Sequence, residues 1–94
     1  MKKSVVIFGR SIPVIQKKNL LKETSQFGYY DYEKLEIAID ADLPPKVAYE
    51  TLIHECGHAL FHRAGLGQTK ISQDIEHVIV EQFSIMMSEN FRNK

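Results

Sequence analysis

Two histidines and a glutamate are spaced so that they could act together on one substrate. They lie in the sequence His54-Glu55-Cys56-Gly57-His58, within a segment whose composition predicts a helix. An α-helix advances by about 100° per residue, so side chains four positions apart share a face. Two imidazoles on one face can hold a zinc ion at about 2.0–2.1 Å. The spacing therefore predicts a metal site with a carboxylate beside it.

The chemistry that this HExxH spacing predicts is the hydrolysis of a peptide bond, because the spacing is typical of zinc proteases. Glu55 would lie beside the metal, take a proton from a zinc-bound water and later deliver it to the leaving amine. The alternative interpretation is a plain helix with two surface histidines. Apolar flanks at 52–53 and 59–61 argue against it. Gly57 costs a helix about 1 kcal/mol relative to alanine, so we expect a neighbouring element to approach closely there.

Two further side chains of the same helix have less specific interpretations. Cys56 lies about 160° around the helix from His58, and we expect it to be a small buried residue rather than a ligand. His62 continues the stripe formed by His54 and His58. It could be an additional ligand or donate a hydrogen bond to one, but we expect it to border the site.

A catalytic zinc usually has a third protein ligand in addition to water, and the second predicted helix must supply it. The candidates are Glu76, His77 and Glu81. On a helical wheel Glu76 falls inside an apolar arc, whereas His77 and Glu81 share the remaining face with Ser84 and Ser88. We expect that face to pack against the HExxH helix. His77 and Glu81 are four residues apart, so one could bind the metal while the other hydrogen-bonds to a ligand.

The elements in front of the HExxH segment have strand patterns. Residues 4–8 and 12–15 predict two strands joined by a turn at Gly9-Arg10. Pro13 has no amide donor, which favours a position at a sheet edge. Residues 35–40 alternate apolar with polar or small side chains, as in a strand with one buried face. Between them, 19–23 could form a helical turn, and 28–32 is rich in aromatic residues.

The second half of the chain predicts two helices. Pro44-Pro45 favours a helix start, and the segment 47–64 contains no breaker except Gly57 before Gly65 ends it. A second helix should run from Ser72 to about residue 91, with acidic residues in its first turn. We therefore expect an α+β fold, with a short antiparallel sheet of three or so strands packed on the HExxH helix and a C-terminal ligand helix.

Size and composition limit the domain organisation and the partners. The chain has 94 residues, enough for one domain over 1–94, and its 44% hydrophobic and 26% charged residues are typical of a globular protein. Twelve basic and twelve acidic residues cancel, so we expect no nucleic-acid partner. No apolar run reaches the length of a membrane span. One cysteine excludes an internal disulfide and fits a reducing compartment, so we expect a cytoplasmic protein.

The HExxH segment also resembles a known family. LIHECGHALFH, at 52–62, is similar to the active-site helix of the ImmA/IrrE-type metallopeptidases, many of whose short members occur in phages and mobile elements. The segment 28–40 is similar to the strands that precede this helix in the family. Phe83-Ser84, with Met87, resembles part of the pattern of its last helix. The resemblance covers about residues 28–90, and only the HExxH stretch is specific.

The resemblance implies a minimal zincin-like domain with zinc-dependent proteolytic activity, which several family members direct at a transcriptional repressor. His54 and His58 would be metal ligands, and Glu55 would be the general base. The family's third ligand is a glutamate, but the matching position here holds His77, with Glu81 four residues later. That departure leaves open a three-histidine site, a shifted register with Glu76 or Glu81 as the ligand, or a weakened enzyme. The larger members' DNA-binding domain has no counterpart here, which implies a catalytic core alone or one that works with a partner.

Two functions follow as hypotheses from these residues. The first is a Zn²⁺-dependent peptidase that acts on a protein or peptide substrate through Glu55, with His54, His58 and His77 or Glu81 at the metal. In such a peptidase, Tyr29, Tyr30 or Tyr32 could stabilise the oxyanion. An extended substrate could pair with a free sheet edge near Pro13 or with the strand at 35–40. The second is a zincin-shaped protein-binding module whose zinc is structural or absent. The sequence leaves the substrate and the oligomeric state undetermined.

Overall fold

A four-stranded sheet forms one layer of the computed structural model, which describes residues 3–64 and 73–90. In space the strand order is β1-β2-β4-β3. The outer pairs are antiparallel, whereas β2 and β4 are parallel. The expected α+β class is confirmed, and four strands agree with the expected three or so, but the sheet is not wholly antiparallel. The strands are β1 Ser4–Ile7, β2 Arg10–Lys17, β3 Gly28–Asp31 and β4 Glu36–Asp40.

The first two strands form a tight hairpin whose turn lies one residue earlier than expected. Phe8 and Gly9 both have positive φ, at 51° and 77°, as in the two-residue turns that match the twist of paired strands. Strand β2 then changes partner. Pro13 is paired with Ser4 of β1, and the next residue, Val14, is paired with Ile37 of β4. Pro13 thus lies at the point where β2 leaves one neighbour for the other, rather than on an edge strand.

The central strand β4 is enclosed on both faces, not on one as its pattern suggested. Ile37, Ala38 and Ile39 are all buried. Ile37 and Ile39 belong to the same hydrophobic cluster as Ala48 and Leu52 of the long helix above the sheet. This packing fixes the helix relative to β4.

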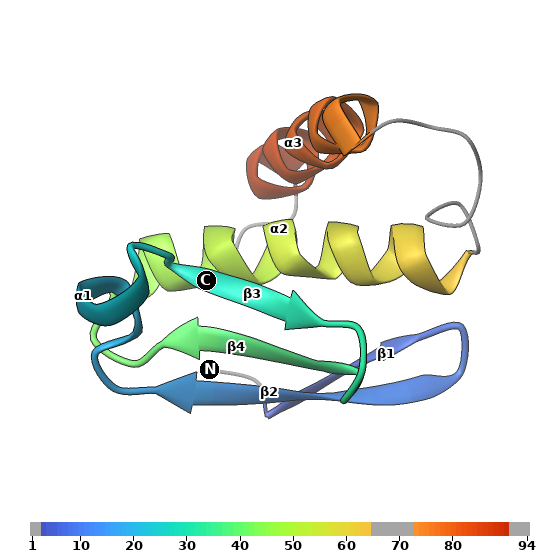
Figure 1. Cartoon of the computed structure of the whole chain (residues 1–94). Coiled ribbons are helices and arrows are strands. Elements are labelled where there is room, and N and C mark those ends of the chain that lie inside the picture. The colour runs from blue at the N-terminus through green and yellow to red at the C-terminus, as the bar shows by residue number, and fades with distance from the viewer. Residues whose placement is uncertain (1–2, 65–72, 91–94) are drawn as a thin grey trace.

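Two long helices complete the layers, in the sequence order expected. Helix α2, Pro45–Arg63, lies across one face of the sheet, and α3, Gln73–Asn90, packs on the side of α2 that faces away from the sheet (Figure 1). Pro44 is the N-cap of α2, and Pro45 occupies its first turn. A short helix α1, Leu20–Thr24, precedes β3, in the region where one helical turn was expected. The expected end signal at Gly65 and start signal at Ser72 lie outside the described residues.

The face of α3 that packs on α2 is wider than the one inferred from the helical wheel, because it takes in Glu76 and Val80 in addition to His77, Glu81 and Ser84. Val80 and Ser84 are buried against α2, and Ser84 was expected there. An alanine Cβ at Gly57 would lie 3.0 Å from Val80 Cγ1, so the expected close approach at this glycine is confirmed. Much of the apolar arc is exposed instead of buried: Ile75, Val78, Ile79, Ile85 and Met86.

Neither long helix has the character of a membrane span. In the part of the chain that the structure describes, no helix combines the length and the apolar composition needed to cross a bilayer.

Candidate functional site

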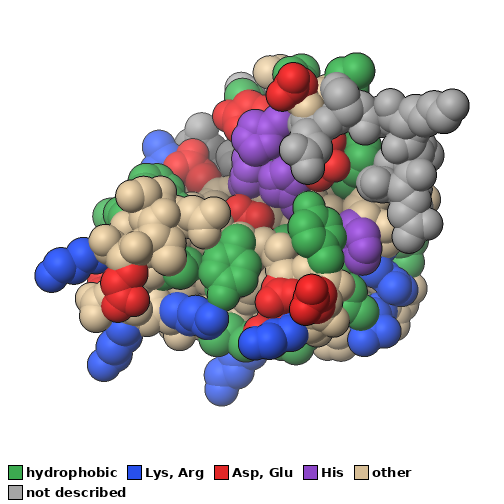
Figure 2. Space-filling model, viewed as in Figure 1, with side chains coloured by type: hydrophobic (Ala, Val, Ile, Leu, Met, Phe, Trp, Pro, Cys, Tyr) green, Lys and Arg blue, Asp and Glu red, His purple; other side chains and the backbone are tan. Residues whose placement is uncertain are grey.

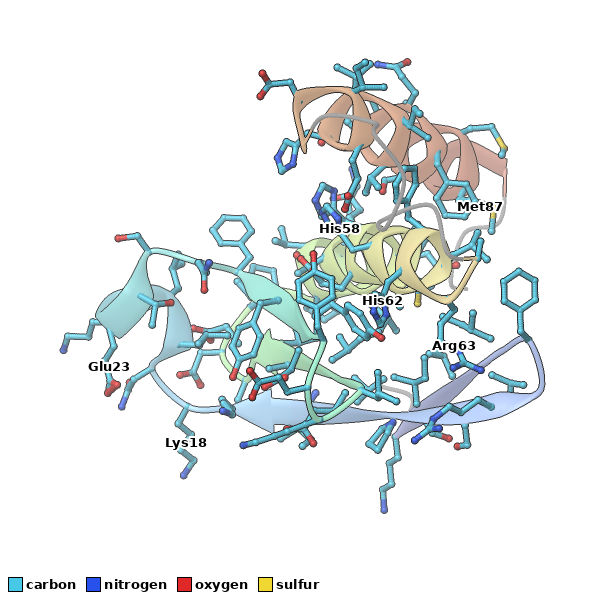
Figure 3. All side chains as sticks on the ribbon, turned by 45° about the vertical axis from the view of Figure 1, so that its right-hand side comes forward. Lys18, Glu23, His58, His62, Arg63 and Met87 are labelled. Atoms are coloured by element: carbon cyan, nitrogen blue, oxygen red, sulfur yellow. The ribbon has the colours of Figure 1, made fainter. Side chains whose placement is uncertain are left out.

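The two histidines of the HExxH sequence turn their rings toward each other. His54 Nε2 and His58 Nε2 are 3.2 Å apart, and the ring centroids are 4.9 Å apart. Two nitrogen ligands of a tetrahedral zinc, each at about 2.0–2.1 Å, are about 3.3 Å apart. His58 points from α2 toward α3 (Figure 3). The spacing of the two nitrogens therefore fits a shared metal ion.

Carboxylates of α3 occupy the opposite edges of these rings. His58 Nδ1 lies 3.0 Å from Glu76 Oε2, within hydrogen-bonding distance, and both side chains are largely buried. His54 Nδ1 lies 3.7 Å from Glu81 Oε2, which is close but longer than a hydrogen bond. A carboxylate at the outer nitrogen holds an imidazole in the tautomer that leaves its other nitrogen free for a metal. Glu76, which the helical wheel placed in the apolar arc, is therefore part of the site.

The electrostatics around His54 favour its neutral form. Burial lowers the pKa of His54, the neighbouring His58 lowers it further, and the charge of Glu81 acts in the opposite direction. A neutral imidazole is the form that binds a metal. His54 is thus prepared for ligation without first losing a proton at neutral pH.

His77 is the third imidazole beside this pair. Its ring centroid lies 6.0 Å from that of His54 and 5.6 Å from that of His58, and the side chain is exposed. Within 3–64 and 73–90, no group of three or more His, Cys, Asp or Glu side chains is arranged so that it could hold a metal ion. Two donors are therefore in position, and His77 lies next to them without converging on the same point.

Glu55 lines the same cavity as His54 and His58, and the sequence predicted that this glutamate lies beside the two histidines. Its side chain is 7% exposed, and burial raises the pKa of the carboxyl to about 7. General acid–base groups work best when their pKa is near the ambient pH. Glu55 can therefore both take up and release a proton near neutrality.

The cavity that contains these groups has a volume of about 820 Å³ and is walled by β3 with the residues around it, by α2 and by α3. Figure 2 shows histidine side chains gathered where α2 and α3 meet, with acidic side chains beside them. The described side chains that line the cavity are mostly aromatic, acidic or apolar, and among these described residues none is Lys or Arg: Gln26, Phe27, Gly28, Tyr29, Tyr30, Tyr32, Val47, Glu50, Thr51, His54, Glu55, His58, His77, Glu81, Ser84 and Ile85.

The remaining histidine and the cysteine of α2 lie away from the paired rings. His62 Nδ1 is 3.1 Å from the Tyr30 hydroxyl, and its side chain points toward the sheet (Figure 3). His62 therefore borders the site through β3, as expected. Cys56 is partly buried and packs against the hydrophobic core, which agrees with its interpretation as a small buried residue.

The sheet edge beside the cavity is β3, not either of the edges expected from the sequence. The 35–40 segment forms β4, which is paired on both sides. The Asp40 amide donates to the Phe27 carbonyl at 2.8 Å, and bonding alternates along an antiparallel ladder, so the amides of Gly28 and Tyr30 face the free edge. A Cβ at Gly28 would lie 2.6 Å from the Ala38 carbonyl oxygen, so β3 needs glycine there. A glycine opening an aromatic strand was the available clue to this close approach.

Comparison of the chain with protein-family models, with curated proteins and with solved structures found no match. The functional argument therefore depends on the geometry of this site.

Proposed function

We propose that the protein is a zinc-dependent peptidase that hydrolyses a peptide bond in a protein or peptide substrate. His54 and His58 would hold the metal through their Nε2 atoms, and His77 would complete the ligand set. The observation that carries this proposal is the 3.2 Å separation of the two Nε2 atoms above a buried carboxyl in one cavity. The single cysteine supports a reducing, cytoplasmic setting.

In this proposal Glu55 moves the proton. A zinc ion in this position would supply Lewis-acid polarisation of the peptide carbonyl and would acidify the attacking water. Glu55 accepts a proton from the water as its oxygen bonds to the carbonyl carbon. It then delivers that proton to the amide nitrogen as the carbon–nitrogen bond breaks. The net result is the addition of one water, and a pKa of about 7 suits both steps.

The other residues of the site position the reacting groups. Glu76 holds the His58 ring, and Glu81 faces the outer nitrogen of His54. The free edge of β3 offers the backbone groups of Gly28 and Tyr30 to an extended peptide, which would then run past the histidine pair. The part of the cavity lining that the structure describes has carboxylates and neither Lys nor Arg, and these carboxylates favour substrates without excess negative charge.

A second function, a zincin-shaped protein-binding module without catalysis, has one observation in its favour. The described side chains include no complete three-donor metal group, and a binding module would not need one. A substitution of Glu55 distinguishes the two functions, because peptide-bond hydrolysis requires a group that carries a proton and binding does not.

The test compares wild type with Glu55→Gln, both loaded with one equivalent of zinc. A proteome-derived peptide library, with cleavage sites identified by mass spectrometry, serves as the substrate. We expect the wild type to cleave a defined set of peptides and Glu55→Gln to be at least about 100-fold slower. Zinc content, measured by elemental analysis, should be equal in both. Equal cleavage by both proteins would contradict the mechanism, and no cleavage by either would favour the binding module.

A further inference from the structure

We propose that Tyr32 is a catalytic residue of this site, which donates a hydrogen bond to the substrate carbonyl oxygen as that oxygen gains negative charge. The inference rests on the proposed peptidase function and adds a residue to it. Hydrolysis of an amide concentrates charge on this oxygen, and a fixed donor beside it accelerates the reaction by stabilising the transition state.

The hydroxyl groups of the three tyrosines that line the cavity have different surroundings. The Tyr29 hydroxyl accepts a hydrogen bond from Lys17 Nζ at 2.7 Å. The Tyr30 hydroxyl is 3.1 Å from His62 Nδ1, and the side chain is buried. Tyr32 is 55% exposed, and in the part of the chain that the structure describes its hydroxyl has no hydrogen-bond partner. Tyr32 is therefore the tyrosine whose hydroxyl is free to donate into the cavity.

The ring of Tyr32 is held in place although its hydroxyl is free. It packs edge-on against Tyr30, with centroids 5.3 Å apart, and against His62, with centroids 5.1 Å apart. Tyr30 and His62 are themselves joined by their hydrogen bond. These two are positioning residues, because they connect Tyr32 to α2 one helical turn after His58.

The backbone that carries Tyr32 is also fixed. Asp31 Oδ1 accepts hydrogen bonds from the amides of Glu33 at 2.9 Å and Lys34 at 3.0 Å, which closes a turn around Tyr32. The Leu35 amide donates to the Asp31 carbonyl at 2.8 Å and ties the end of the turn back to β3. A donor on such a turn needs little reorganisation when the substrate reacts.

Charges around Tyr32 agree with a role as a donor. Burial raises the pKa of its hydroxyl, and the carboxylates of Glu76 and Glu55 raise it further. The phenol therefore keeps its proton at neutral pH. Tyr32 and Glu55, the proposed general base, line the same cavity.

The test is Tyr32→Phe, which removes the hydroxyl and keeps the ring that packs on Tyr30 and His62. An internally quenched peptide, built on the best cleavage site from the peptide library, gives kcat and KM for the zinc-loaded proteins. We expect kcat to fall by about 100-fold, the scale for losing one oxyanion donor, with KM and zinc content nearly unchanged. Tyr49→Phe makes the same chemical change on α2, outside the cavity lining, and should leave kcat as in wild type.

Each other outcome overturns the inference in a recognisable way. A wild-type kcat in Tyr32→Phe, or a kcat loss found in Tyr29→Phe instead, removes Tyr32 and leaves the peptidase proposal standing. Loss of zinc from Tyr32→Phe would assign the residue a structural role. If zinc-loaded wild type cleaves no peptide and behaves as Glu55→Gln does, the peptidase proposal fails and the role of Tyr32 fails with it.

Discussion

The two nitrogens of each imidazole have separate roles in this site. The Nε2 atoms of His54 and His58 face each other, whereas their Nδ1 atoms face Glu81 and Glu76 of α3. Glu76, at 3.0 Å from His58 Nδ1, and Glu81, at 3.7 Å from His54 Nδ1, both lie on the far side of the rings from the Nε2 atoms, which is a poor position for binding a metal between those atoms. Among the three candidates for the third ligand, we therefore propose His77, with the two glutamates orienting the rings.

Replacing His77 should therefore affect zinc binding more than replacing either glutamate. We expect His77→Ala to lose stoichiometric zinc in equilibrium dialysis. Glu81→Ala should retain zinc with an affinity about 10- to 100-fold lower, the usual effect of removing a residue that orients a ligand. His62→Ala, an imidazole removed from the same helix but away from the pair, is the matched control and should bind zinc as wild type does. Zinc loss in Glu81→Ala and not in His77→Ala would contradict this assignment.

Glu55 should make the stability of the metal-free protein depend on pH. Burial raises its pKa from 4.5 to about 7, so the folded protein holds this proton more tightly than the unfolded chain. The contribution of Glu55 to the free energy of unfolding is then largest below pH 4.5, falls as the pH rises toward 7, and stays low above pH 7. The shift corresponds to at most about 3 kcal/mol. The lowered pKa of His54 acts in the opposite direction, with stability lost as the pH falls below 6.5.

The comparison that isolates Glu55 is wild type against Glu55→Gln in the presence of a chelator. Urea unfolding from pH 4.5 to 8 should show the stability of wild type falling relative to the variant by about 1–3 kcal/mol. The contribution of His54 is present in both proteins and cancels in the difference. Parallel curves for the two proteins would show that the carboxyl is not buried as described.

Helices α2 and α3 meet at a glycine, and this contact sets the distance between the two halves of the site. Gly57 lies between Glu55 and His58 in the sequence, and Val80 and Phe83 of α3 lie 3.0 Å and 3.3 Å from where a Cβ at this glycine would be. A closer or wider separation would move Glu76, His77 and Glu81 relative to the histidine pair. The glycine inside the HExxH sequence is thus a packing requirement of the site.

Adding a methyl group at this contact should be unfavourable. In Gly57→Ala the new Cβ would lie 3.0 Å from Val80 Cγ1 and 3.3 Å from Phe83 Cδ1, so both side chains would have to shift by a few tenths of an ångström. We expect overpacking to outweigh the helical preference for alanine, with a net loss of about 1–2 kcal/mol in urea unfolding. Val80→Ala restores the space, so the double variant should lose less than the sum of the single losses. If the two single losses of stability added up exactly in the double variant, the methyl group added at Gly57 would not be in contact with Val80.

The sequence predicted the elements of this fold better than their pairing. Local residues determine a hairpin turn at Phe8-Gly9 or a helix start at Pro44-Pro45, so those elements were predictable within a few residues. The parallel pairing of β2 with β4 depends on contacts between residues far apart in the sequence, and no local pattern encodes it. The same limit applies to Glu76: a helical wheel shows which residues share a face, but not which face the neighbouring helix covers.

At the scale of the whole molecule, the chain forms a sheet, a central helix and an outer helix, and the histidine cluster lies between the two helices, with β3 as the third wall of the cavity. Helix α3 packs mainly on α2 and not on the sheet (Figure 1). Its outward surface carries exposed apolar side chains, including Val78 and Ile79, so much of its apolar area is not used for packing. The outer layer should therefore be the first to open, while the strands and α2 share a common core.

Zinc should stabilise the outer layer selectively, because its proposed ligands come from both α2 and α3. A ligand at about a thousand times its Kd stabilises the folded state by about 4 kcal/mol, and local opening of α3 would break the site. Hydrogen exchange measured by mass spectrometry, with zinc or with chelator, should show the largest gain in protection within 73–90. Peptides from β2 and β4 should change less, since their local opening does not disturb the metal. In His77→Ala the selective protection should vanish, while His62→Ala should retain it. A uniform gain over the sheet and both helices would mean that α3 does not open separately, and no gain would mean that the metal does not join the two helices.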